Sequence, residues 1–242
     1  YEKLVVIKKY NSNNNERKKL LKREIENYEK IDHPFIPKFY GVIKFNDLYS
    51  PVIEFINGNT LFDTDFSQFS EIEIFEIIIQ MLLVINYLHN NHFIYRDLKP
   101  NNVIIDENKT FVLIDFDRMI KDDENTSTIN FETQFAAPEI NTNNITNKSD
   151  VFSIGEIIKI IIPDIENNEY YSMIYPIYLN CIDKNQSNRP SVLDLFRAIF
   201  SFIYSKNITL ELNKKIYYYT LTANENITQA HYNLGLMYEG GK

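Results

Sequence analysis

Patterns of apolar residues divide the chain into a short strand-bearing part and a longer helical part. The β-branched run at residues 4–8 predicts a strand, and residues 16–31 repeat apolar positions at helical spacing. Residues 41–56, with a turn at Asn46-Asp47, predict a β-hairpin. Asn57-Gly58-Asn59 breaks this pattern, and we expect helices to dominate the chain that follows.

The second part is predicted to combine helices with one further hairpin. Ser70 and Glu73 have the spacing of a capping box, ahead of an apolar run rich enough for a buried helix. Short strands are expected at 102–106 and 110–114, before a polar loop over 117–136, and loops of that length are usually functional. Helices are expected over residues 72–88, 149–162 (starting at a Ser149-Asp150 cap), 171–182 and 190–204.

Composition narrows the class of protein. Of 242 residues, 44% are hydrophobic and 24% charged, which is typical of a packed globular protein. The net charge is −8 and no long basic block occurs, so we expect no nucleic-acid partner. Cys181 is the only cysteine, which excludes an internal disulfide and favours an intracellular, cytoplasmic setting. The apolar runs are shorter than the roughly 20 residues of a membrane span, so no span is expected.

The most informative stretch is residues 93–117. It contains Arg-Asp-Leu-Lys-Pro followed by Asn102, five positions after Asp97, and then Ile114-Asp115-Phe116 beyond a short hairpin. In type and spacing these residues resemble the catalytic loop and the metal-binding motif of the eukaryotic protein kinase family. Because the hairpin folds the chain back, we expect Asp115 to lie beside Asp97 and Asn102.

This resemblance implies an ATP-dependent protein serine/threonine kinase that uses Mg²⁺. Asp97 would orient the acceptor hydroxyl and take its proton, and Lys99 would neutralise the moving phosphoryl group. Asn102 and Asp115 would hold Mg²⁺ between the nucleotide phosphates. A lysine two residues after the aspartate is the serine/threonine-type signature, so ATP, Mg²⁺ and a protein substrate are expected.

The amino-terminal strand resembles a second part of the same family. Val5-Val6-Ile7-Lys8 is similar to the family's Val-Ala-Ile-Lys strand, and alternation puts Val6 and Lys8 on one face. By resemblance Lys8 would reach the α- and β-phosphates, and Val6 would lie against the adenine. Glu24 shares a helical stripe with Leu21 and Tyr28, so its carboxylate points inward and is expected to pair with Lys8.

The resemblance extends over almost all of residues 1–205 and implies an α+β, two-lobed, kinase-like fold. In the connection between the lobes, Ile53 would be the gatekeeper, and backbone groups of Glu54 and Ile56 would bind adenine. The implied divisions are a small, incomplete β-rich N-lobe (1–54), a hinge (54–59) and a large helical C-lobe (60–205).

Three further matches concern the architecture of the C-lobe. Ala137-Pro138-Glu139 matches the end of the family's activation segment, and Glu139 is expected to pair with Arg189. Asp150 is expected to hold the backbone of the catalytic loop. These residues would shape the site without touching nucleotide.

Three departures from the family pattern keep an alternative open. The Gly-rich loop that would cover the phosphates is absent from a chain whose first strand begins almost at Tyr1, and we therefore expect a fragment. Asp117 stands where the family has glycine, although Asp tolerates left-handed geometry better than most residues. Tyr95 replaces the usual histidine and could serve the same packing role. A pseudokinase, which keeps the fold as a scaffold, is therefore an alternative to an active kinase.

The activation segment is acidic and suggests two hypotheses about its control. Arg96 is of the type that senses a phosphate on this segment. One hypothesis is that Thr126, Ser127 or Thr128 is a regulatory phosphorylation site. The other is that the acidic run beginning at Asp122 already supplies the negative charge.

The last residues, 207–242, change character. Ala230, Tyr232, Tyr238 and Gly240-Gly241 occur at the spacing of a helix pair and resemble one Sel-like repeat, a relative of the tetratricopeptide class. A single repeat cannot bury its own apolar face, so it is expected to pack on the C-lobe, or to begin an array that binds a protein partner. A repeat-based adaptor with an ancillary kinase lobe is the second alternative.

Overall fold

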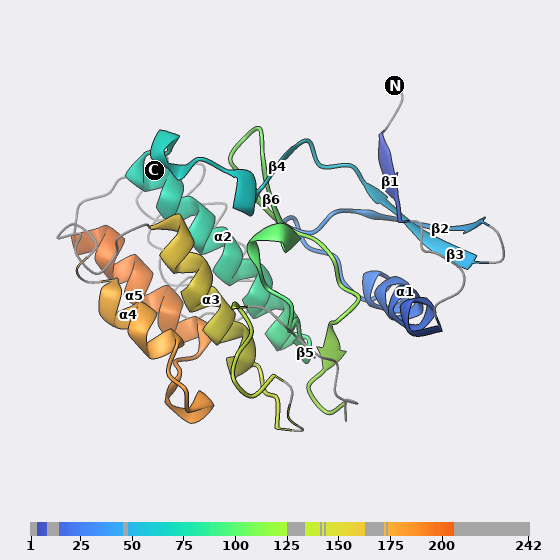
Figure 1. Ribbon diagram of the computed structural model, residues 1–242. Helices are drawn as coiled ribbons and strands as arrows, with labels where there is room; N and C mark the ends of the chain where they lie inside the picture. The colour runs from blue at the N-terminus through green and yellow to red at the C-terminus, as the bar shows by residue number, and fades with distance from the viewer. Residues whose placement is uncertain are drawn as a thin grey trace, which may run out of the picture.

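A three-stranded antiparallel sheet with one helix beside it forms the first part of the structure (Figure 1). The computed structural model describes residues 4–8, 15–45, 48–124, 134–140, 142, 144–162, 172 and 174–205. The strands are β1 (Val5–Ile7), β2 (Phe39–Phe45) and β3 (Leu48–Glu54), in the order β1-β3-β2. The predicted strand and hairpin are therefore confirmed, and β1 lies at an edge of the sheet.

Helix α1 (Asn15–Tyr28) has a buried stripe that contains two polar residues. Leu21, Glu24 and Tyr28 are buried as expected, and Asn27 is buried with them, whereas Ile25 is only half-buried. The helix ends three residues before the predicted limit, because the backbone tightens after Tyr28: the N–H of Lys30 bonds the carbonyl of Asn27 at 3.0 Å. The polar members of this stripe turn out to serve the site described below.

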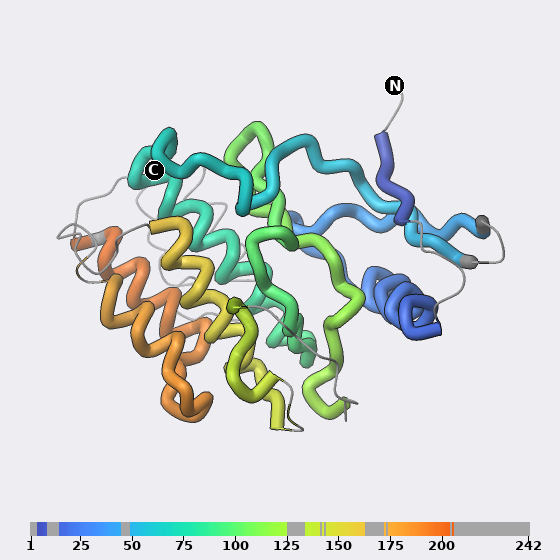
Figure 2. The backbone as a smooth tube through the Cα atoms, in the orientation of Figure 1, coloured from blue at the N-terminus to red at the C-terminus, as the bar shows by residue number. Residues whose placement is uncertain are grey.

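The chain passes from the sheet into the helical part through residues 54–58 (Figure 2). The expectation that Asn57-Gly58-Asn59 breaks the strand pattern is wrong, because β4 (Gly58–Thr60) pairs antiparallel with β6 (Val103–Asp106). A Cβ on Gly58 would lie 2.3 Å from the carbonyl oxygen of Ile105. Glycine is needed there because the two backbones approach too closely for any side chain.

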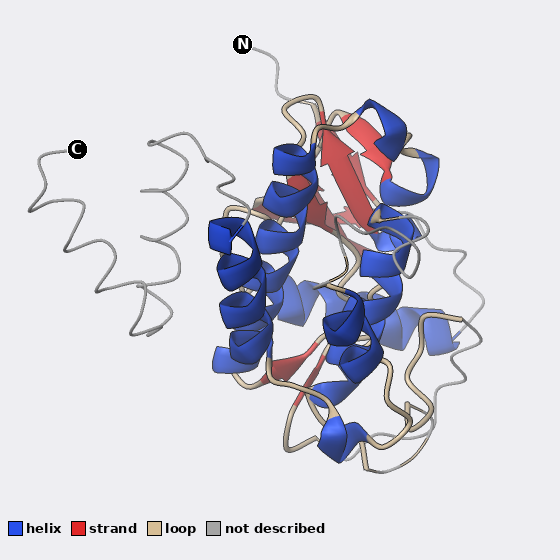
Figure 3. Ribbon diagram, turned by 90° about the vertical axis from the view of Figure 1, so that its left-hand side faces the viewer, coloured by secondary structure: helices blue, strands red, loops and turns tan. Residues whose placement is uncertain are grey.

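The described residues of the larger part form four α-helices, and helices stand close together in this part of Figure 3. The hairpin expected between the two motifs is present as β6 and β7 (Phe111–Leu113), and a small ladder joins β5 (Phe93–Ile94) to β8 (Ile120–Lys121). The helices are α2 (Glu71–Asn90), α3 (Lys148–Ile161), α4 (Tyr175–Cys181) and α5 (Val192–Ser205). Short 3₁₀ turns lie at Leu61–Asp63, Phe66–Gln68, Pro100–Asn102 and Gln186–Asn188.

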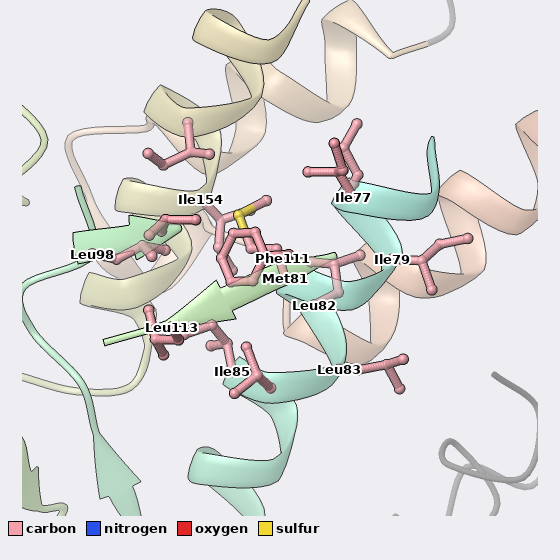
Figure 4. Packing of buried hydrophobic residues seen from close by; sticks show 14 of the residues in the cluster. Ile77, Ile79, Met81, Leu82, Leu83, Ile85, Leu98, Phe111, Leu113 and Ile154 are labelled. Carbon is pink, nitrogen blue, oxygen red and sulfur yellow. The ribbon is translucent and has the colours of Figure 1, made fainter. Parts of the chain in front are cut away.

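Helix α2 is the centre of the core. Its capping box is confirmed: Ser70 accepts from the N–H of Glu73, and the Glu73 carboxylate accepts from the N–H of Ser70. Figure 4 shows Met81, Leu82 and Ile85 facing the strand that carries Phe111 and Leu113. Although the apolar runs predicted no membrane span, α2 has the length and hydropathy of one; 78% of that window is buried in the protein, as in a core helix.

Helix α3 starts one residue earlier than predicted and without the predicted cap. Asn147 occupies the cap position with no side-chain hydrogen bond, while Ser149 and Asp150 lie in the first turn. Both are buried and bind other segments: Ser149 Oγ donates to Glu139 at 2.9 Å, and Asp150 bonds the chain near Tyr95. Because both side chains bond distant segments, neither caps α3.

The observed architecture is α+β, with a small sheet-bearing part and a larger helical part. Glu139 and Arg189 form the expected ion pair across the helical part, with contacts of 2.6 and 2.9 Å. The segment proposed as a repeat, residues 207–242, lies outside the described residues. So do Thr126, Ser127 and Thr128.

Candidate functional site

One buried carboxylate holds the loop between β5 and the 3₁₀ turn at Pro100–Asn102. Asp150 on α3 accepts hydrogen bonds from the N–H of Tyr95 at 2.9 Å and of Arg96 at 2.7 Å. Arg96 has a φ of +69°, a left-handed conformation that a non-glycine residue adopts only when its surroundings hold it. The loop therefore presents the next residue, Asp97, in a fixed orientation.

One oxygen of Asp97 is surrounded by donors. Its Oδ2 accepts from Lys99 Nζ at 2.7 Å and from Asn102 Nδ2 at 2.8 Å, and Arg118 Nε lies 3.8 Å away. Asn102 Nδ2 also donates to the Asp97 carbonyl at 2.9 Å. Among the described residues nothing donates to Oδ1 of Asp97. That oxygen is the one an incoming hydroxyl can use.

A second cluster joins the sheet, α1 and the loop that begins at Asp115. Lys8 Nζ, just after β1, forms an ion pair with the buried carboxylate of Glu24 on α1. The same nitrogen bonds Asp115 Oδ1 at 2.9 Å. Lys8 therefore holds α1 and the Asp115 loop together. The pair with Glu24 was expected, and the contact with Asp115 is additional.

The two clusters lie next to each other. The N–H of Ile114 bonds the carbonyl of Asn102 at 3.0 Å, and Tyr95 Oη donates to the carbonyl of Ile114 at 2.5 Å. Tyr95 thus ties its own loop to the residue before Asp115. The packing role expected for this ring did not include such a hydrogen bond. Its pKa is raised well above the usual value, first by burial and then by the negative charges of Asp115 and Asp97. The structure thus brings the backbones of the two motifs into direct contact.

A column of aromatic rings supports the site from behind. Phe39 on β2 stacks on Tyr28 with ring centroids 5.7 Å apart, and Tyr28 meets Phe116 edge-on at 5.1 Å. Phe116 in turn meets Tyr95 edge-on at 5.5 Å. The column links the sheet, α1, the Asp115 loop and the loop that carries Tyr95.

Burial and crowding of carboxylates shift several pKa values. The pKa of Glu24 is raised to about 7 by burial, which the attraction of Lys8 only partly offsets. Burial and then the charge of Asp115 raise the pKa of Asp117 to about 6. The pKa of Lys8 is raised because its two carboxylate partners outweigh the effect of burial. The site thus holds an excess of negative charge at buried and half-buried positions.

The position of Asp117 does not require glycine in this conformation. Residues with positive φ among the described non-glycine residues are His92, Arg96, Lys109 and Asp115, the last at +68°. Asp117 is not among them, so the argument from left-handed geometry at this position is wrong. The strained residue of the motif is Asp115, and Asp117 adds charge without adding backbone strain.

The donor set fits Mg²⁺ that arrives with phosphate. Both donor hydrogens of Asn102 face Asp97, which leaves its amide oxygen and the Asp115 carboxylate as hard oxygen ligands. In the described ranges, no group of three or more His, Cys, Asp or Glu side chains could hold a metal unaided. Mg²⁺ commonly uses one or two carboxylates and takes the remaining ligands from phosphate and water. A divalent cation would also relieve the excess negative charge.

The residues expected to contact adenine lie along β1 and β3. Val6 faces Ile53 across the two strands, and Ile53 is buried while Val6 is half-buried against the core. Glu54 ends β3, where its N–H bonds the carbonyl of Lys38 at 2.9 Å. Ile56 follows in the connection to β4. Val6, Ile53 and Glu54 thus lie on the paired strands β1 and β3, and Ile56 lies just beyond β3.

Two contacts at the site could not be read from the family pattern. Asn27, buried on α1, donates through Nδ2 to the carbonyls of Phe116 at 2.7 Å and Met119 at 3.1 Å. It thereby clamps both ends of the turn that follows Asp115. Arg118, in that turn, accepts through its carbonyl from Arg96 Nε at 2.7 Å. In the sequence, the feature that could have indicated the role of Asn27 was the presence of an asparagine within the apolar stripe of the predicted helix.

The raised pKa of Glu24 predicts a pH dependence of stability. Between about pH 4.5 and 7 the folded protein keeps a proton on Glu24 that the unfolded chain has lost, so stability falls as pH rises. The raised pKa of Asp117 also makes stability fall as pH rises, over a lower pH range. Between about pH 5 and 8, the unfolding free energy of Glu24→Gln should therefore fall less than that of wild type. The two decreases should differ by on the order of 2 kcal/mol.

Urea titrations without nucleotide or metal measure this difference. The matched control is Glu26→Gln, an exposed position on the same helix that pairs with Lys22 at 3.6 Å. It should follow the wild-type pH curve. Parallel curves for wild type and Glu24→Gln would show that the carboxylate titrates normally.

Comparison with known proteins adds to this geometry. A family model for the protein kinase domain matches residues 1–165. Calcium-dependent protein kinase 5 of Plasmodium berghei (strain Anka) is 33% identical over 164 residues, which cover 65% of this chain and 29% of that protein. Serine/threonine-protein kinase SIK1 of Mus musculus is 32% identical over 146 residues, covering 58% and 19%.

A longer match is to the probable serine/threonine-protein kinase kinX of Dictyostelium discoideum. It is 28% identical over 229 residues, which cover 83% of this chain and 20% of that protein. The chain thus spans less than a third of the length of each of these relatives. Since the family model covers more than half of the chain, and the site is built from that family's motifs, the chain belongs to the protein kinase family.

Proposed function

We propose that this chain is the catalytic part of an ATP-dependent protein serine/threonine kinase. The observation that carries the proposal is the shared position of Lys8, bonded to both Glu24 and Asp115. This arrangement joins the sheet, α1 and the metal-binding loop in one site beside Asp97. Two of these relatives are named as serine/threonine-protein kinases, which supports serine/threonine specificity, and so does Lys99, two residues after Asp97.

The chain's own side chains account for the steps of phosphoryl transfer. The acceptor hydroxyl oxygen forms a bond to the γ-phosphorus of ATP while the bond to the β–γ bridging oxygen breaks, which releases ADP. The hydroxyl proton goes to Oδ1 of Asp97. Lys99 lies close enough to Asp97 to meet the charge on the moving phosphoryl group. A bound Mg²⁺, held by Asn102 and Asp115, would neutralise charge on the β- and γ-phosphate oxygens.

Binding of ATP tests the metal assignment. In the full-length protein, Mg²⁺ should tighten ATP binding at least about tenfold, because the metal links the phosphates to Asp115. Asp115→Asn should lose most of this gain in calorimetric titrations with and without Mg²⁺. Asp122→Asn, which changes an exposed carboxylate bonded to His92 at 3.0 Å, should keep it. An Asp115→Asn protein with the wild-type response to Mg²⁺ would remove Asp115 from the metal site.

Asp117 favours a second candidate, a pseudokinase scaffold. Its half-buried carboxylate interacts with that of Asp115 and raises the negative charge of the site beyond the family pattern. A scaffold would bind nucleotide weakly and transfer no phosphate. If Asp117→Gly creates activity in an otherwise inactive full-length protein, the scaffold is the native function.

A further inference from the structure

Arg118 brings a second cation to Asp97, from a different part of the chain. Its Nε lies 3.8 Å from Asp97 Oδ2, the oxygen that also accepts from Lys99 Nζ at 2.7 Å. Lys99 follows Asp97 in the same loop, whereas Arg118 belongs to the turn after Asp115. Two cations from separate segments therefore face one oxygen of the carboxylate that would receive the acceptor hydroxyl.

The backbone of the turn that carries Arg118 is held on both sides. Asn27 Nδ2 donates to the carbonyl of Phe116 at 2.7 Å and to that of Met119 at 3.1 Å, and these two residues enclose Arg118. The carbonyl of Arg118 itself accepts from Arg96 Nε at 2.7 Å. Asn27 and Arg96 are both buried, so water competes little for these hydrogen bonds. The turn is thus fixed before any substrate binds.

The part of this site that solvent reaches is positively charged. The side chain of Asp97 is 4% exposed, while those of Lys99 and Arg118 are 24% and 25% exposed. An approaching polypeptide therefore meets two cations before it meets the carboxylate. This local charge is opposite in sign to the net charge of the chain, which is −8. A local positive potential attracts anionic groups even when the whole molecule is acidic.

Asp117, the residue before Arg118, offsets this charge only in part. Its half-buried carboxylate interacts most strongly with Asp115 and then with Lys8, and less with Arg118. Lys8 and Asp115 bond each other at 2.9 Å in the cluster assigned above to the nucleotide and the metal. Asp117 thus acts mainly on the metal side of the site, and the charge of Arg118 remains available on the acceptor side.

We propose that Arg118 is a specificity-determining residue, which selects acceptor segments that carry an acidic side chain next to the serine or threonine. A guanidinium binds a carboxylate through parallel N–H donors, so Asp or Glu fits it better than a neutral residue. Because Arg118 is close to Asp97, and an extended chain advances about 3.3 Å per residue, the acidic residue would lie within about two positions of the acceptor. The inference rests on the proposed kinase function and names its class of substrate.

Matched peptides test this assignment on the full-length protein. Each contains one serine and differs only in Glu or Gln at one of the two positions on either side. With wild type, kcat/KM for the best Glu peptide should exceed that for its Gln partner about five- to tenfold, because the new ion pair is partly shielded from water. Arg118→Gln should bring this ratio close to one. Arg118→Lys, which keeps the charge, should retain part of the preference, and Arg118→Glu should favour a Lys peptide instead.

The ratio of two peptides separates substrate choice from a general loss of activity. If Arg118 only oriented Asp97, its replacement would lower both rates and leave the ratio unchanged. The matched control is Lys22→Gln, an exposed cation on α1, which should keep the wild-type ratio. Equal rates for the Glu and Gln peptides with wild type, or an unchanged ratio in Arg118→Gln, would overturn the proposal.

Peptide binding distinguishes failure of this inference from failure of the kinase assignment. If wild type transfers no phosphate to any peptide, calorimetric titration with the same peptides still measures selection by charge. Tighter binding of the Glu peptide that is lost in Arg118→Gln would support a cationic acceptor site in a protein without transfer activity. Equal binding of the Glu and Gln peptides would overturn the role of Arg118.

Discussion

Replacing Asp97 with Asn should lower kcat for phosphoryl transfer by about three orders of magnitude, within the range contributed by a general base. The change keeps the size of the side chain, and its oxygen can still accept from Lys99 and Asn102. It removes the basic oxygen that takes the hydroxyl proton. Since the proposed role of Asp97 is toward the acceptor hydroxyl and not toward the nucleotide, ATP binding should stay near the wild-type value.

Steady-state kinetics and calorimetry on the same full-length protein separate these two effects. The matched control is Asp32→Asn, an exposed carboxylate after the end of α1, which should leave both kcat and ATP binding unchanged. A similar kcat for wild type and Asp97→Asn would remove Asp97 from the chemistry. A parallel loss of ATP binding would instead assign it to nucleotide recognition.

Replacing Arg189 with Ala should destabilise the helical part by about 3–5 kcal/mol. The guanidinium is fully buried and bonds both oxygens of Glu139, and it also donates to the carbonyls of Lys148 and Asp183. Its removal leaves a largely buried carboxylate and two carbonyls without their main donor. The pKa of Glu139 is lowered although burial opposes this, chiefly because of Arg189.

Denaturant titration and thermal unfolding measure this loss, and the melting temperature should fall by roughly 10 °C. Arg197→Ala is the matched control, because that exposed side chain pairs with Asp194 within one helix at 3.2 Å. Its cost should stay below about 0.5 kcal/mol. If the unfolding free energy of Arg189→Ala lies within about 1 kcal/mol of the wild-type value, the Arg189–Glu139 pair does not stabilise the helical part as proposed.

Several features of the fold and site could be predicted because local sequence determines them. The capping box at Ser70 and Glu73 and the hairpin of β6 and β7 depend on residues close together in the chain. The spacing from Asp97 to Asn102 is fixed by one turn. Pairing of Lys8 with Glu24 followed from the cost of an unpaired buried carboxylate, an argument that needs no coordinates.

Other features depended on segments distant in sequence and could not be predicted. Gly58 resembled a strand breaker, but its lack of a side chain is what lets β4 approach β6. Ser149 and Asp150 had the residue types of a cap, yet each bonds another segment. Asn27 and the pair of Arg23 with Glu124 match no local motif, because their partners lie about 90 and 101 residues away.

Identification of the phosphorylated residue tests the central claim most directly. The full-length protein would be incubated with γ-labelled ATP, Mg²⁺ and a general protein acceptor, and the labelled acceptor hydrolysed to amino acids. We predict label on phosphoserine and phosphothreonine, dependent on Mg²⁺ and reduced to background in Asp97→Asn. An acceptor that carries no more label with wild type than with Asp97→Asn would contradict the account.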